Sequence, residues 1–112
     1  MEINVRHVDN VTIIEPKGKI MIGVGDVALR NAIVEALETG AKNILVNMEK
    51  VTTIDSSGIG ELVSAYTRVT HHGGKMKLLN LPPKVNDILQ ITQLITVFET
   101  FDDEREALDS FQ

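Results

Sequence analysis

The chain switches repeatedly between two hydrophobic periods, and this switching constrains its fold more than any other feature. Short apolar or alternating runs, typical of strands, precede longer stretches in which apolar residues recur every three or four positions. We expect strands at 3–8, 11–15, 43–48, 75–81 and 95–101. We expect helices from Asp26, a favourable N-cap residue, to Gly40, from Ile59 to Gly73, from Pro82-Pro83 through Leu89, and after Asp102.

The order of these segments indicates how the sheet is connected. Asp9-Asn10 supplies turn residues, so the first two strands are expected to form an antiparallel hairpin. The later strands alternate with helices, and such units form right-handed crossovers between parallel strands. The sequence therefore predicts an α/β fold with a mixed sheet. No repeat or linker divides the 112 residues, so 1–112 is expected to form a single domain.

Composition argues against several classes of function. The absence of cysteine excludes disulfides, thiolate metal sites and cysteine nucleophiles. The 16 acidic and 11 basic residues give a net charge of -5, which argues against a general binder of nucleic-acid backbones. No apolar run reaches the roughly 20 residues that span a bilayer, and the N-terminus lacks the features of a secretory signal. We therefore expect a cytoplasmic protein that binds neither nucleic acid nor membrane.

One glycine-rich segment, Gly23-Val24-Gly25-Asp26-Val27-Ala28, matches a dinucleotide-binding fingerprint and lies between an apolar run and a helix. Glu49 follows near the end of the next strand, where such folds place an acid on a ribose hydroxyl. A full dinucleotide domain, however, pairs two mononucleotide halves and needs a longer chain. The alternatives are nucleotide-phosphate binding and a sharp turn from strand to helix, and we favour the turn.

Candidate catalytic and metal-binding groups are few. His71 and His72 should point to different sides of a helix end with no third ligand at metal spacing, and His7 stands alone in a strand. Ser57 lacks the nucleophile-elbow pattern, because position 55 is Asp rather than Gly. We therefore expect no catalytic residue, no metal and no cofactor, and do not expect an enzyme.

The segment Asp55-Ser56-Ser57-Gly58-Ile59-Gly60-Glu61 has two compatible interpretations. Asp and Ser are favoured at helix N-caps because their oxygens accept hydrogen bonds from the free amides of the first turn. A hydroxyl at a helix start is also accessible to a kinase. A phosphate bound there gains from the helix dipole and from free amide donors. Capping and phosphorylation can therefore occur at the same place.

These residues resemble the STAS domains of bacterial anti-sigma factor antagonists. The resemblance spans nearly the whole chain, and its most specific part is the Asp55-Ser56-Ser57-Gly58-Ile59-Gly60 motif, followed by Gly73-Gly74-Lys75-Met76-Lys77-Leu78. It implies a STAS fold with a mixed four- to five-stranded sheet and about four helices flanking one side. The strand and helix pattern predicts the same class of architecture.

The resemblance also implies a regulatory function. In that family the second hydroxyl residue of the motif, Ser57 here, accepts phosphate from a partner that is both an anti-sigma factor and a serine kinase. Asp55, Ser56, Gly58 and Ile59 would form the partner-binding loop and adjoining helix start. The unmodified protein would occupy the anti-sigma factor and free a sigma factor, phosphorylation would end this, and a phosphatase would restore it.

One segment departs from the family pattern. Relatives with the serine switch commonly carry acidic residues after the second strand, whereas this chain reads Gly18-Lys19-Ile20-Met21-Ile22-Gly23. That region helps relatives meet the kinase, so the change bears on which partner is bound. The alternative functions are a structural STAS module of a larger signalling assembly and a small nucleotide-binding protein that uses Gly23 to Ala28.

Overall fold

A β-hairpin begins the fold, and its second strand organises the sheet. The computed structural model describes residues 1–112, and β1 (Glu2–Val8) pairs antiparallel with β2 (Val11–Ile20) through a turn at Asp9 and Asn10. Both turn residues have positive φ, 52° and 67°, as tight hairpin turns require. The expected hairpin is confirmed, and β2 continues through Pro16 and Gly18 to Ile20.

Strand β2 divides its pairing between two parallel neighbours. Its first half pairs with β3 (Asn43–Asn47) over residues 11–14, and its second half pairs with β4 (Val51–Ile54) over residues 18–20. Pro16 lies between the two ladders, where no N–H group is needed for pairing on that side. Strand β5 (Lys75–Leu79) pairs parallel with β3, so that the main path of the sheet is β1-β2-β3-β5-β6.

The sheet has six strands, and two details differ from the sequence prediction. Strand β4 is an addition to the predicted strands, and it is only four residues long. The strand predicted at 95–101 is reduced to β6 (Thr100–Phe101), so the prediction is wrong for most of that segment. Gln93 adopts a left-handed conformation with φ 62°, and the chain continues as a 3-10 turn, η1 (Leu94–Thr96). Leu94 and Ile95 pack on the core from this turn instead of from a strand.

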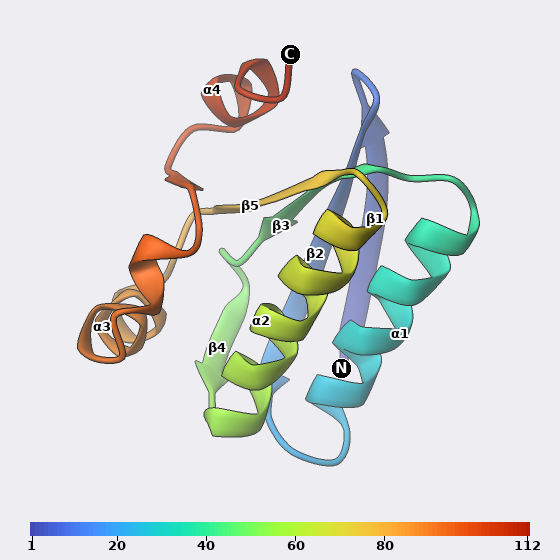
Figure 1. The fold of residues 1–112 in the computed structure, drawn as a ribbon. Coiled ribbons are helices and arrows are strands. Elements are labelled where there is room, and N and C mark those ends of the chain that lie inside the picture. Colours follow the sequence, from blue (N-terminus) through green and yellow to red (C-terminus); the bar gives the residue numbers. More distant parts are fainter.

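Helices cover both faces of the sheet, which corrects the expectation that they flank one side. Figure 1 shows α1 (Gly25–Glu38) and α2 (Ser56–His71) side by side on one face, with α3 (Pro83–Ile91) beyond β4 and α4 (Glu104–Asp109) set apart from them. Because side chains alternate along a strand, Ile14, Val46 and Leu78 face the larger core, and Ile13, Leu45 and Leu79 face the other side. Ala107 and Leu108 of α4 cover this second face.

Two of the expected helix ends are confirmed in detail. Gly40 follows α1 with φ 100°, and Gly73 follows α2 with φ 80°, so each glycine takes the left-handed conformation that ends a helix. Pro83 begins α3 as expected. The helix predicted from Ile59 begins earlier, at Ser56. No helix of the structure is both long and apolar enough to cross a membrane.

A buried lysine fastens the C-terminal helix to the sheet. Lys77 of β5 is only 4% exposed, and its Nζ donates hydrogen bonds of 2.9 Å to both the carbonyl oxygen and Oγ of Ser110. The ammonium group also lies 3.2 Å from an oxygen of Glu99 and 4.8 Å from the centroid of the Phe111 ring. These partners satisfy the charge, so the residues just beyond α4 are held against β5.

Replacing Lys77 with alanine is expected to lower the free energy of unfolding by about 2 kcal/mol, because the change removes charged hydrogen bonds and leaves Ser110 without a donor. Urea denaturation of the two proteins measures this difference. Lys75→Ala is the matched control, because Lys75 is an exposed lysine on the same strand, and we expect a change within about 0.5 kcal/mol. Equal losses in both variants would contradict the anchoring role of Lys77.

Candidate functional site

The start of α2 is built around the carboxylate of Asp55. Asp55 is the N-cap residue, and its Oδ1 accepts a hydrogen bond of 2.9 Å from the amide of Gly58. The carbonyl of Asp55 accepts the first helical bond, from the amide of Ile59, at 3.0 Å. The capping interpretation of the motif is therefore confirmed. Of the four predicted loop residues, Asp55 is the cap, and Ser56, Gly58 and Ile59 lie in the first turn of α2 together with Ser57.

The same carboxylate reaches a second segment of the chain. Oδ2 of Asp55 accepts a hydrogen bond of 3.0 Å from the amide of Ile22, in the loop between β2 and α1. Asp55 therefore joins the β2–α1 loop to the first turn of α2. The amides of Ile22 and Gly58 stabilise the charged carboxylate, and they lower the pKa of Asp55 from its usual value.

Two glycines let both helix starts rest on the end of β2. A Cβ atom at Gly58 would lie 2.1 Å from the carbonyl oxygen of Ile20, and one at Gly25 would lie 2.0 Å from the carbonyl oxygen of Lys19. Nothing larger than glycine fits at either place without backbone movement. An ion pair between Arg30 of α1 and Glu61 of α2, with Nε 2.9 Å from Oε1, further ties the two helices together.

The two serines differ in their exposure. Ser56 is exposed and Ser57 is half-buried at the second position of α2, and neither hydroxyl is hydrogen-bonded to another protein group. Neither hydroxyl therefore holds the fold together through a hydrogen bond. The amides of Gly58 and Ile59 are already bonded to Asp55, so the first-turn amides that favour an anion here are those of Ser56 and Ser57.

The β2–α1 loop beside this site is apolar and exposed. Ile22 is 74% exposed and Val24 is 66% exposed, and Met21 lies beside them at 38%. A shallow hollow of about 470 Å³ includes these three side chains together with Lys17 and Lys19. The surface beside Ser57 therefore combines apolar side chains with lysines, in a chain whose net charge is -5.

The glycine-rich segment acts as a turn. Helix α1 begins at Gly25, so Asp26 lies inside the first turn, and the prediction that Asp26 is the N-cap residue is wrong. The carboxylate of Asp26 accepts hydrogen bonds from the amides of Gly23, at 2.9 Å, and Val27, at 2.7 Å. A nucleotide phosphate would need free amide donors here, and these two amides are already bonded to the carboxylate of Asp26. Glu49 is exposed in the turn between β3 and β4.

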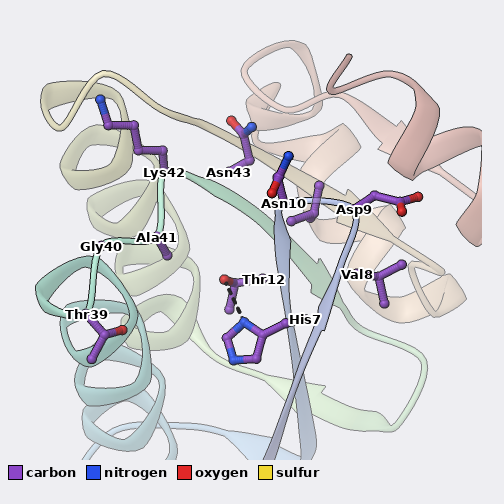
Figure 2. Close-up of a pocket in the computed structure, with 11 residues that line it drawn as sticks. His7, Val8, Asp9, Asn10, Thr12, Thr39, Gly40, Ala41, Lys42 and Asn43 are labelled. Carbon is purple, nitrogen blue, oxygen red and sulfur yellow. Dashed lines mark hydrogen bonds between the residues drawn. The ribbon is translucent and has the colours of Figure 1, made fainter.

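The histidines do not come together with one another or with Ser57 in one site. Figure 2 shows the ring of His7 beside Thr12. His7 Nδ1 and Thr12 Oγ1 are 3.4 Å apart, and both residues line a hollow of about 590 Å³. This hollow lies where β2 and β3 begin, whereas Ser57 lies just beyond the end of β4, in the first turn of α2. His72 at the end of α2 contacts the carbonyl oxygen of Arg68. No group of three His, Cys, Asp or Glu residues is arranged to hold a metal ion.

Comparisons with known proteins show the family of this chain. A model of the STAS domain family matches residues 2–107. The chain belongs to the STAS domain family. An anti-sigma F factor antagonist of Paenibacillus polymyxa is 24% identical over 100% of this STAS domain chain and 96% of its own length.

Two solved structures share the STAS fold of the chain. An anti-sigma factor antagonist from Mycobacterium paratuberculosis has a TM-score of 0.85 at 20% identity, covering 98% of this chain and 92% of its own. The Bacillus cell fate determinant SpoIIAA in its phosphorylated form has a TM-score of 0.77 at 24% identity, covering 99% of this chain and 100% of its own. The STAS fold predicted from the sequence is thereby confirmed.

The role of Asp55 as a bridge leads to a prediction about pH. Because the pKa of Asp55 is lowered in the folded protein, its bonds to Ile22 and Gly58 add stability that is fully present above the usual pKa of aspartate, near 4. This stability is lost as the pH falls through the lowered pKa. In NMR spectra the amide shifts of Ile22 and Gly58 are expected to change together, with one apparent pKa that lies below the usual pKa of aspartate.

An asparagine variant separates the two bonds of that carboxylate. In Asp55→Asn the new side chain keeps one oxygen that caps Gly58 but lacks a second acceptor for Ile22. This variant should therefore speed hydrogen exchange at the Ile22 amide and leave the α2 amides protected. Asp55→Ala should expose both amides. Unchanged exchange at Ile22 in both variants would show that the bridge does not hold the loop.

Proposed function

We propose that the chain, acting as a single STAS domain over residues 1–112, is an anti-sigma factor antagonist that is switched off by phosphorylation of Ser57. The unmodified form binds an anti-sigma factor that is also a serine kinase, and this releases a sigma factor in the cytoplasm. A phosphatase restores the binding form. The protein itself supplies the acceptor hydroxyl, and the partner supplies the catalysis.

One observation carries this proposal: an unengaged serine hydroxyl stands at the start of α2, in a chain aligned end to end with an anti-sigma F factor antagonist. A solved structure with the same fold, SpoIIAA in its phosphorylated form, supports the view that this fold can carry a phosphoryl group. Ser57, rather than Ser56, is proposed as the acceptor because it occupies the second hydroxyl position of the motif.

The physical effect of the phosphoryl group explains the switch. Phosphorylation adds a charge of about -1.5 to -2 at neutral pH, close to the carboxylate of Asp55. The helix start accommodates this charge, so the domain need not unfold. The complex does not tolerate it, because a strongly hydrated group enters a surface that must lose its water on binding.

The β2–α1 loop indicates the chemistry of the partner surface. Ile22 and Val24 present exposed apolar side chains, and Lys17 and Lys19 lie beside them. A partner that fits this surface has an apolar centre with acidic groups at its rim. The acids that relatives carry in this segment would favour a basic partner surface instead. The departure at Lys19 and Met21 therefore sets partner choice and leaves the phosphorylation mechanism unchanged.

Phosphate mapping tests the proposed function. The protein is incubated with ATP and the cognate anti-sigma factor kinase, and the modified peptide is located by mass spectrometry. We expect one phosphate on Ser57, none in Ser57→Ala, and normal modification in Ser56→Ala, which serves as the matched control. Phosphate on Ser56 or at a distant residue, with Ser57→Ala still modified, would refute the assignment.

A further inference from the structure

Strand β1 leaves one edge of the sheet open. It pairs only with β2, and no strand lies on its other side (Figure 1). The turn at Asp9 and Asn10 makes Val8 and Val11 a hydrogen-bonded pair, and such pairs alternate along an antiparallel hairpin. Ile3, Val5 and His7 therefore direct their backbone N–H and C=O groups outward, and these groups are free to pair with another strand.

An apolar groove runs beside this open edge. It has a volume of about 660 Å³ and lies between β1 and α1. Ile3 and Val5 contribute from the strand, Ala28 and Ala32 from the helix, and Val5 is 44% exposed. The small alanine side chains make room above the edge. An additional strand that pairs with β1 would therefore place alternate side chains in this groove.

We propose that the additional strand is β1 of a second copy of this chain, paired antiparallel across a two-fold axis. The strand that forms the groove also carries side chains that fill it, because Ile3 and Val5 lie on the same face of β1. A two-fold contact of this kind uses the same surface on both copies and closes on itself. It does not involve Ser57.

The charges of β1 select one register for this pairing. With Asn4 on the axis, Ile3 lies opposite Val5 of the second copy, and Glu2 lies opposite Arg6 of the second copy. The register with Val5 on the axis sets Glu2 opposite Val8, and the register with Arg6 on the axis sets two arginines opposite each other. Only the first register pairs apolar with apolar and acid with base.

Neighbouring residues support the charge pairing in that register. Glu2 already lies opposite Lys17 of β2, and Arg6 lies 3.2 Å from Glu15. The contact between Glu2 and Arg6 of the second copy therefore joins the Glu2–Lys17 pair of one copy to the Arg6–Glu15 ion pair of the other. The contact is small, which makes the dimer weak and reversible, with a dissociation constant on the order of 100 µM.

Sedimentation equilibrium tests this dimer with the full chain. Between about 10 µM and 1 mM we expect a reversible shift from monomer to dimer. Val5→Pro should abolish the shift, because proline removes an outward N–H that the hairpin does not use. Val5→Thr, the matched control, keeps that N–H and the branched shape, and it should still dimerise. A chain that stays monomeric throughout this range would overturn the proposal.

Two further measurements guard against a misfolded variant. Glu2→Lys leaves the backbone intact and sets the new lysine opposite Arg6 of the second copy, so it should weaken dimerisation at least about 10-fold. Ile91→Lys, at an exposed apolar residue outside the groove, should have no effect. In wild-type spectra, concentration should shift the amides of Ile3, Val5 and His7. A dimer indifferent to Val5→Pro and Glu2→Lys would refute this interface.

Discussion

Phosphorylation of Ser57 is expected to weaken binding of the anti-sigma factor at least about 100-fold. A charge of about -1.5 to -2 within the contact should cost several kcal/mol, and about 1.4 kcal/mol corresponds to a factor of ten in affinity. Isothermal titration calorimetry of the purified phosphorylated and unmodified proteins measures the difference. The circular dichroism spectrum of the modified protein should be unchanged, because the helix start accommodates an anion.

Serine variants separate charge from size in this prediction. Ser57→Ala should bind within a few-fold of the unmodified protein, whereas Ser57→Asp should bind more weakly, though less so than the phosphorylated form. Ser56→Asp is the matched control, because it adds the same charge one residue earlier, at an exposed position. If Ser57→Asp and Ser57→Ala bound equally well, a charge-based switch at this residue would be excluded.

Gly58→Ala should strongly destabilise the fold at the candidate site. The new Cβ atom would lie 2.1 Å from the carbonyl oxygen of Ile20 and 2.6 Å from Cγ1 of Ile54. The backbone of β2 cannot yield without breaking its pairing with β4, so we expect a loss of about 3 kcal/mol in the free energy of unfolding. Thermal and urea denaturation measure the loss.

Gly60→Ala is the matched control for that change. Gly60 lies two residues further along α2 and is exposed, and a Cβ atom added there would meet no other atom within 4 Å. Alanine favours the helix over glycine, so this variant should gain about 0.5–1 kcal/mol. The two substitutions therefore have opposite expected signs. A similar gain in both variants would show that helix propensity, rather than contact with β2, decides the effect.

The class of the fold could be predicted from the sequence because the hydrophobic periods are strong and their breaks are clear. Gly40 and Gly73 end helices at the predicted places, and Asp9-Asn10 forms the hairpin turn. The choice of sheet face for α4 could not be predicted in the same way. Its apolar residues Ala107 and Leu108 indicate a buried side, but the path of the chain after β5 decides which layer they join.

The residues of the candidate site could be predicted from the sequence, but only some of their contacts could. The capping bond from Gly58 to Asp55 spans three residues and follows from local preferences. The bond from Ile22 to Asp55 spans 33 residues, and no local pattern reveals it. The burial of Lys77 has the same origin, because its partner Ser110 is also 33 residues away. Contacts of this kind depend on which strand ends meet in space.

The hydrogen bond to Asp55 holds the β2–α1 loop in place whatever side chains the loop carries. Asp55 accepts its bond from the backbone amide of Ile22, and every residue except proline offers the same donor. Side chains at 19, 21, 22 and 24 can therefore be exchanged while the loop stays in place beside Ser57. Under the proposed function, chains that share this bridge can keep the same phosphorylation site and differ in the partner that their loop contacts.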